Sequence, residues 1–190
     1  HFLVTSPMAE GLFDKAVVMS GGNGGSMRAA DFAATEAIGV NFARTNGIAG
    51  DDSEALEKLR ALSADEVTDG LNLATMSVVN DAGERTFASP FPDALIAVDA
   101  KAAYEDGDFA EVPMMIGATD ADIGGPTGFM VAGAREIAGE VAERGVPVWQ
   151  YRFSYVADSV DSKGAQHATD IPFFFDTAEI KYGAQTTAKD

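Results

Sequence analysis

The sequence predicts an α/β fold, as one domain or part of one, in which a parallel sheet is flanked by helices. Apolar runs typical of buried strands alternate with amphipathic helical patterns along the chain, and this alternation favours βαβ units. The 190 residues suffice for one domain with a sizeable buried core. Apolar residues make up 46% of the chain and charged residues 23%, which is the balance of a globular protein.

The first predicted elements are a strand and a helix. The apolar run 15–20 is stopped by the glycine-rich residues 21–25, which indicates a buried strand that enters a loop. A turn explains these glycines better than a phosphate site, because neither a dinucleotide fingerprint nor a P-loop pattern is present. Residues 31–46 carry apolar side chains at helical spacing, and Gly47 can end that helix.

Two capping signatures predict two further helices. Asp51 with Glu54 resembles a capping box ahead of one helix, and Ser63 with Glu66 repeats the signature ahead of a shorter one. Residues 80–92 are rich in turn-forming residues, which predicts a loop or hairpin.

The second half of the chain continues the alternation of helices and strands. A helix is predicted over 93–104, and the apolar run 112–117 predicts a second buried strand. Residues 127–144 form a long amphipathic pattern that ends before a glycine and a proline, and 148–156 alternate aromatic side chains as a third strand does. The last stretch is polar and is expected to be frayed. No internal repeat and no clear domain boundary occurs.

Charge and composition exclude several function classes. Acidic residues outnumber basic ones 30 to 13, so the net charge is −17 and the isoelectric point lies near 4.2. Such a surface repels phosphate backbones and anionic membranes. No stretch approaches the roughly 20 apolar residues of a membrane-spanning helix. The chain has no cysteine and two histidines, which excludes thiolate chemistry and disfavours a metal site.

The candidate catalytic residues follow the second and third predicted strands. Asp120 and Asp122 come after the strand that ends near Gly117, and His167 lies in the loop after the third strand. Catalytic groups of open α/β sheets gather beyond the carboxyl ends of strands, and acid before histidine is the chain order of α/β-hydrolase triads. Taken alone, aspartates of this kind also serve as helix caps, and a lone histidine is more often structural.

Four segments resemble motifs of the type-B carboxylesterases, the cholinesterase-like esterases. Residues 5–21 are similar to the SP-x-A-x-GLF-x-x-A-I-x-x-SG stretch that follows the nucleophile elbow, and 112–122 to the VP-x-x-x-GT-x-x-DEG acid motif. Residues 147–155 resemble the PVY-x-YRFSY strand, and 164–175 the GA-x-H-G-x-E-IP-x-x-F histidine motif. This resemblance implies an α/β-hydrolase fold, with residues 1–190 forming an incomplete C-terminal portion of it.

The resemblance also implies site residues. His167 would be the general base, and Asp122 would be the acid that orients it, with Asp120 as the fallback because the acid motif has lost its DEG core. Ser20 would give the acid a hydrogen bond. Trp149, Phe173 and Phe174 would shape the substrate pocket, although core packing is the ordinary role of such aromatic side chains.

Two departures from the family pattern shape the functional expectation. No Gly-x-Ser-x-Gly occurs, so the nucleophilic serine and the oxyanion loop are expected in a segment before His1 or in a companion chain. The short spacing between acid and histidine suggests a missing segment near residues 124–127. We therefore expect part of a serine carboxylesterase that acts on small-molecule carboxylic esters, needs no metal or organic cofactor and is inactive alone. The alternative is a catalytically silent cholinesterase-like binding protein.

Overall fold

The computed structural model describes most of the chain, namely residues 1–25, 32–72, 75–76, 78–88 and 99–190. The chain divides into two compact units, which the sequence did not indicate. Unit 1 comprises His1–Ser26 with Pro92–Asp190, and unit 2 is Met27–Phe91. The assignment of residues 1–190 to one partial domain, with a missing segment near 124–127, stays a prediction.

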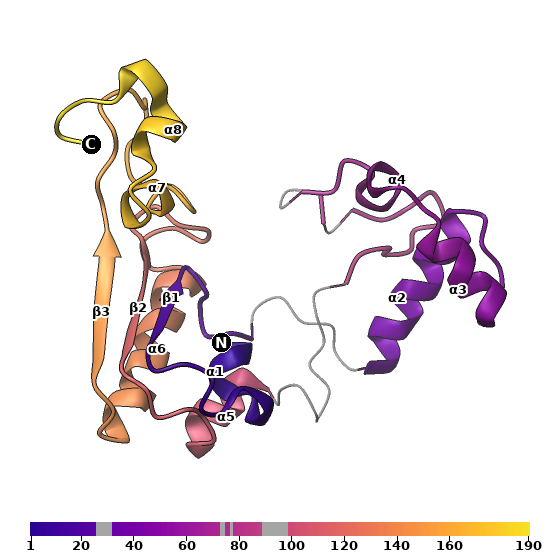
Figure 1. Cartoon of the computed structure of the whole chain (residues 1–190), viewed down its shortest axis with the longest axis horizontal. Helices are drawn as coiled ribbons and strands as arrows, with labels where there is room; N and C mark the ends of the chain where they lie inside the picture. Colours follow the sequence, from indigo (N-terminus) through magenta and orange to yellow (C-terminus); the bar gives the residue numbers. More distant parts are fainter. Residues whose placement is uncertain (26–31, 73–74, 77, 89–98) are drawn as a thin grey trace. The chain divides into compact units, whose positions relative to one another are not determined.

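Unit 1 is built on a three-stranded parallel sheet of order β1-β2-β3 (Figure 1). The strands are β1 (Ala16–Met19), β2 (Met114–Thr119) and β3 (Val148–Phe153), so all three predicted strands are confirmed. The central strand β2 is the most buried of the three, as a strand paired on both edges requires. All three strands point the same way, so the loops that follow them leave from one edge of the sheet.

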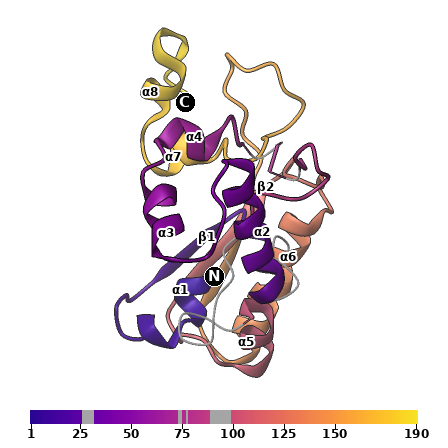
Figure 2. The same ribbon diagram turned by 90° about the vertical axis from the view of Figure 1, so that its right-hand side faces the viewer.

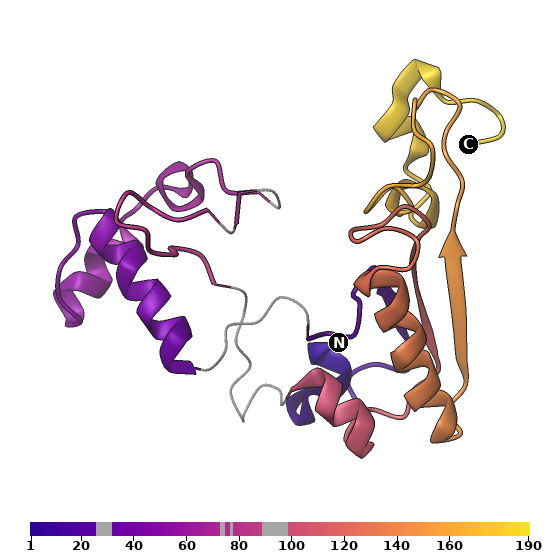
Figure 3. The same cartoon turned by 180° about the vertical axis from the view of Figure 1, so that it is seen from behind.

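Three helices build the core of unit 1 with the sheet. The long helix α6 (Phe129–Glu143) connects β2 to β3 and packs on both strands, as the view from behind shows (Figure 3). Helix α5 (Ala100–Asp106) packs on α6, and α1 (Phe2–Thr5) packs on α5. The core consists of Val4, Val18, Tyr104, Met114, Ile116, Ala134, Ile137, Val141 and Val146. The part of the predicted helix 93–104 that precedes Asp99 lies outside the described residues.

Unit 1 also contains short helices that the sequence did not predict. They are η1 (Pro7–Ala9), α7 (Ile171–Phe174), α8 (Ala178–Tyr182) and η2 (Gly183–Gln185). The last three occupy the stretch expected to be frayed. Aromatic contacts hold α7 and α8, since the ring of Phe173 lies 5.4 Å from Phe153, 5.2 Å from Tyr155 and 6.1 Å from Tyr182. Such contacts join distant parts of the chain, so local sequence patterns do not reveal them.

Unit 2 is a small helical unit with its own apolar contacts. It contains α2 (Phe32–Thr45), α3 (Ser53–Arg60) and α4 (Ala64–Thr68), which are labelled in Figure 2. A core of Ala43, Ile48 and Ala55 packs with Leu59 and Leu62.

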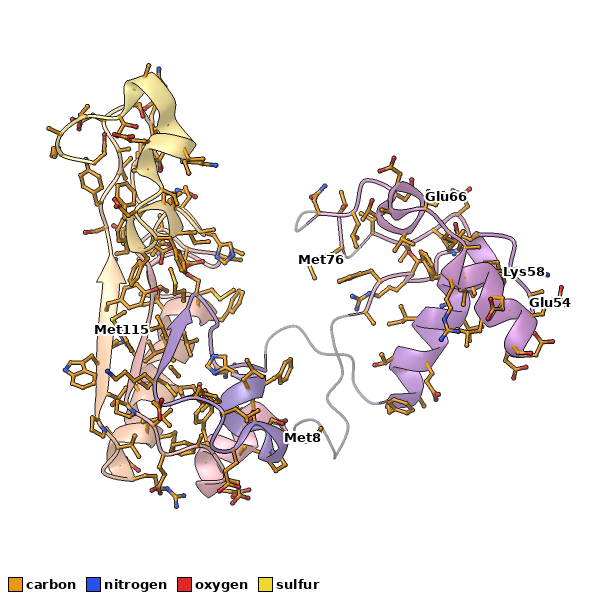
Figure 4. The ribbon with its side chains drawn as sticks, viewed as in Figure 1. Met8, Glu54, Lys58, Glu66, Met76 and Met115 are labelled. Atoms are coloured by element: carbon orange, nitrogen blue, oxygen red, sulfur yellow. The ribbon has the colours of Figure 1, made fainter. Side chains whose placement is uncertain are left out.

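The helix starts of unit 2 confirm one predicted cap and correct the other. Ser63 and Glu66 form the predicted capping box of α4. For α3 the cap is Asp52, because its carboxylate accepts the backbone N–H of Ala55 at 2.9 Å; the predicted Asp51 is one residue too early. Glu54 acts instead in an exposed ion pair with Lys58, 2.8 Å away on the same face of α3 (Figure 4).

Two further features of the described residues complete the fold. An antiparallel bridge joins Val79 to Arg85, as the predicted hairpin requires, and residues 89–92 of that segment lie outside the described part. None of the helices in the described ranges has the length and apolar character that crossing a membrane demands.

Candidate active site

The candidate site lies at the carboxyl edge of the sheet in unit 1. Ser20 directly follows β1, Asp122 lies three residues beyond the end of β2, and His167 belongs to the loop after β3. Because the strands are parallel, these three positions leave the sheet at the same edge. The backbone N–H of Ser20 donates to the carbonyl oxygen of Gly117 at 2.8 Å, which fixes the start of its loop to β2.

The carboxylate of Asp122 is the centre of the site, and five hydrogen bonds converge on it. Its Oδ2 accepts the Ser20 hydroxyl at 2.6 Å, and the hydroxyl and backbone N–H of Thr119 at 3.0 and 3.2 Å. Its Oδ1 accepts the backbone N–H of Ile123 at 2.7 Å and faces Nδ1 of His167 at 2.8 Å. The side chain of Asp122 is fully buried, so these donors replace the water it has lost.

The hydrogen bonds decide the protonation state of Asp122. Burial by itself would raise the pKa of this carboxyl, but donors from Ser20, Ile123, His167 and Thr119 outweigh that effect and hold the pKa below its ordinary value. Asp122 is therefore negatively charged at neutral pH. A charged acceptor is what a neighbouring imidazole needs if it is to take up a proton.

This lowered pKa predicts an acid-dependent loss of stability. A carboxyl with a pKa lower in the folded than in the unfolded chain stabilises the fold above the unfolded value, and the contribution is lost as pH falls through the folded value. We expect the difference in unfolding free energy between the wild type and Asp122→Asn to be largest near pH 7 and to shrink below about pH 4. Urea unfolding of both chains from pH 7 to pH 3 measures it. A constant difference would contradict the role of these hydrogen bonds.

His167 presents one ring nitrogen to Asp122 and leaves the other available. Its side chain is 33% exposed, and none of the described residues forms a hydrogen bond with Nε2. Because the carboxylate can only accept, Nδ1 of the neutral imidazole carries the proton and Nε2 carries the lone pair. This tautomer can accept a proton at Nε2 from a neighbouring hydroxyl.

The fallback acid, Asp120, holds a different partner. Its Oδ1 accepts the backbone N–H of Ala165 at 2.7 Å, and its own backbone N–H donates to Phe153 at 2.8 Å. The carboxylate that meets the imidazole is thus that of Asp122, while Asp120 contacts the loop that carries the histidine. The catalytic role of Asp122 and His167 stays a prediction.

The sequence comparisons bear on this site. The profile described as "Carboxylesterase family" matches residues 1–130, more than half of the chain. The chain belongs to the carboxylesterase family. The matched residues include Ser20 and Asp122, and the fold of this carboxylesterase-family chain places His167 beside Asp122. No curated protein sequence matched the chain.

Solved structures agree in fold with this member of the carboxylesterase family. An esterase from Clostridium hathewayi, described as able to hydrolyse aliphatic aromatic polyesters, covers 94% of the chain with 18% identity and a TM-score of 0.60. A PNB esterase covers 93% with 18% identity and a TM-score of 0.66. The juvenile hormone esterase of Manduca sexta covers 93% with 20% identity and a TM-score of 0.63. These likenesses confirm the predicted α/β-hydrolase fold.

The carboxylesterase-family chain spans less than half of these structures. It covers 44% of the Clostridium hathewayi esterase, 45% of the PNB esterase and 47% of the juvenile hormone esterase.

The predicted pocket aromatics lie at different places in this carboxylesterase-family fold. Phe173 packs within the aromatic contacts described above, and the ring of Phe174 lies 5.2 Å from that of Tyr151. Trp149 is 60% exposed. It pairs in register with Met115 near the amino ends of β3 and β2, so it lies away from the edge of the sheet that carries Asp122 and His167. Their role in a substrate pocket stays a prediction.

Sequence reasoning missed two polar groups near Asp122 and His167. Thr119, the last residue of β2, is fully buried and gives Asp122 two hydrogen bonds. Asp170, 1% exposed, accepts the Tyr151 hydroxyl at 3.0 Å. Burial, followed by the charge of Asp170, raises the pKa of Tyr151 well above its ordinary value. The alternation of β3 assigned Tyr151 to an aromatic row, and only the fold shows its polar partner.

Two further features concern ligands. Unit 2 contains a cavity of about 930 Å³ lined by residues of α2, by Asn46 and by residues 66–71, 75–76, 78–80 and 86–88, with none of the predicted site residues among them. Within the described residues, no group of three or more histidine, aspartate or glutamate side chains is arranged to hold a metal ion.

Proposed function

We propose that this chain carries the acid and the base of a serine carboxylesterase that hydrolyses small-molecule carboxylic esters through an acyl-enzyme. The observation that supports it most directly is the 2.8 Å contact between Nδ1 of His167 and the buried, charged carboxylate of Asp122. Family membership and the α/β-hydrolase fold point to the same class of reaction. Because no Gly-x-Ser-x-Gly occurs, the nucleophile and the oxyanion donors would come from sequence outside this chain.

The first half of the proposed reaction acylates the serine. Nε2 of His167 takes the proton of the serine hydroxyl while its oxygen attacks the ester carbonyl carbon. The carbonyl electrons move to the oxygen, which the oxyanion donors stabilise. The imidazolium then gives its proton to the alcohol oxygen as the bond between this oxygen and the carbonyl carbon breaks. An alcohol leaves, and the acyl group remains on the serine.

The second half repeats the same proton movements with water. Nε2 removes a proton from water as the water oxygen attacks the acyl carbon, and the proton passes to the serine oxygen as the acyl bond breaks. Asp122 stays ionised throughout and stabilises the imidazolium by its charge. The chain thus orients the imidazole and supplies one negative charge beside it. A neutral residue at position 122 would not supply that charge.

Active-site labelling of the isolated chain tests the proposal. We expect no covalent labelling by a fluorophosphonate probe and no turnover of a p-nitrophenyl ester, because the nucleophile lies elsewhere. Labelling of the 190-residue chain alone would overturn this division of roles.

The codons before His1 give a second test. Gly-Glu-Ser-Ala-Gly encoded a few residues upstream is the expected result. Another residue at the serine position would contradict an esterase and would instead indicate a cholinesterase-like binding protein. A version extended upstream to include both this segment and the oxyanion loop should gain fluorophosphonate labelling, and the same version with its serine replaced by alanine is the matched control.

A further inference from the structure

The loop that carries His167 is held against the segment that carries Asp122. Ala121 and Gln166 form an isolated parallel bridge beyond the ends of β2 and β3. The backbone N–H of Ala121 donates to the carbonyl oxygen of Ala165 at 3.0 Å. The backbone N–H of Ala165 donates in turn to Oδ1 of Asp120 at 2.7 Å. The Asp120 side chain thus takes the place of a backbone acceptor in this short ladder.

Asp120 is itself fixed by the sheet. Its backbone N–H donates to the carbonyl oxygen of Phe153, the last residue of β3, at 2.8 Å. The sheet therefore holds the backbone of Asp120, and the Asp120 carboxylate reaches the loop at Ala165, two residues before His167. Ala165 is 1% exposed, so water does not compete freely for its N–H.

Gly164 shows how close this approach is. A Cβ atom built at Gly164 would lie 2.9 Å from Cβ of Ala121 and 3.0 Å from Oδ1 of Asp120. A side chain there would push the loop away from both residues. The glycine permits the approach, and the Asp120 carboxylate then holds it.

We propose that Asp120 is a positioning residue for His167, in that its carboxylate oxygen anchors Ala165 and so keeps Nδ1 of the imidazole within reach of Asp122. The consequence for ester hydrolysis rests on the proposed function; the positioning itself does not. Loss of the Asp120 acceptor leaves the bridge between Ala121 and Gln166, with its bond from the Ala121 N–H to the Ala165 carbonyl oxygen, so the loop loosens without detaching. An error of about 1 Å in a catalytic group can cost about 100-fold in rate.

The first test observes the histidine directly and needs no substrate. The chain has two histidines, so NMR of the ¹⁵N-histidine-labelled chain resolves the hydrogen-bonded Nδ1 proton of His167. We expect Asp120→Ala to broaden or abolish this signal and Asp120→Asn, which keeps an acceptor oxygen, to preserve it. Asp161→Ala, an exposed carboxylate of the same loop, is the matched control. Circular dichroism establishes that each variant is folded.

The kinetic test uses the extended enzyme with a p-nitrophenyl ester. We expect Asp120→Ala to lower kcat about 10- to 100-fold at unchanged KM, and Asp120→Asn to restore kcat to within about threefold of wild type. Gly164→Ala should likewise lower kcat at unchanged KM, because the added Cβ atom pushes the loop away from Asp120 and Ala121. An unchanged Nδ1 proton signal in Asp120→Ala, or equal losses in Asp120→Ala and Asp120→Asn, would overturn the proposal. The expected NMR pattern without hydrolysis by the unaltered extended enzyme would instead overturn the proposed function and leave the positioning role standing.

Discussion

Replacing His167 by alanine is expected to lower kcat of the complete esterase by about 10³- to 10⁶-fold, the range found when a triad histidine is removed. The imidazole makes the 2.8 Å contact with Asp122 and offers Nε2 to the reaction, so alanine at this position leaves the proposed reaction without its base. Its side chain is one-third exposed, so its removal should leave the fold intact. KM should change little, because the lost interaction is made in the transition state.

The control for this substitution is Lys163→Ala, an exposed residue four positions earlier in the same loop, which should keep kcat within about twofold. Hydrolysis of a p-nitrophenyl ester at several pH values measures both variants. The loss in His167→Ala should be partly restored by added imidazole, because a small base can enter the space that the side chain leaves. A kcat within tenfold of wild type would remove His167 from the mechanism.

The strands and the long helix could be predicted because their signals are local. The runs that became β1 and β2 are continuous apolar segments bounded by turn residues, and burial in a parallel sheet produces that pattern. Helix α6 repeats apolar residues at helical spacing on the face that packs against the sheet. Element ends were less predictable, as the displaced cap at Asp52 shows, because two adjacent aspartates are equally good caps in sequence.

The parts that the sequence could not predict depend on contacts between distant residues. Helices α7 and α8 are too short to be stable alone and rely on the rings around Phe173. The backbone of Ala168 adopts φ +66°, at a position where the resembling motif has glycine. Nothing in the residue type alanine announces this conformation.

The residues of the candidate site could be predicted, but the hydrogen bonds that join them could not. Asp120 and Asp122 lie two residues apart, so an extended backbone points both side chains to the same side and their order along the chain cannot separate their roles. The fold separates them through the backbone, since Ala165 presents an N–H to Asp120 while the histidine ring reaches Asp122. The Thr119 bonds were likewise hidden, because a threonine that ends an apolar strand looks like ordinary strand sequence.

Asparagine substitutions at the two aspartates separate these roles by effect. Asp122→Asn is expected to lower kcat about 10³- to 10⁴-fold, whereas Asp120→Asn stays within about threefold. The Ala165 N–H needs only an acceptor oxygen, which asparagine retains. At position 122 the loss of charge removes the stabilisation of the imidazolium.

The geometry around Asp122 leaves asparagine no harmless orientation. If the amide nitrogen replaces Oδ1, it donates to Nδ1 of His167, so the imidazole proton moves to Nε2 and the base is lost. In this orientation the amide nitrogen also faces the Ile123 N–H, 2.7 Å from that position. If it replaces Oδ2, it faces the Thr119 N–H, 3.2 Å from that position, and His167 keeps its tautomer beside a neutral amide. Both orientations lower kcat, the first through the wrong tautomer and the second through the missing charge. Steady-state hydrolysis by the two variants decides the assignment: a severe loss in Asp120→Asn with a mild one in Asp122→Asn would move the acid to position 120 and contradict the hydrogen bonding described for both residues.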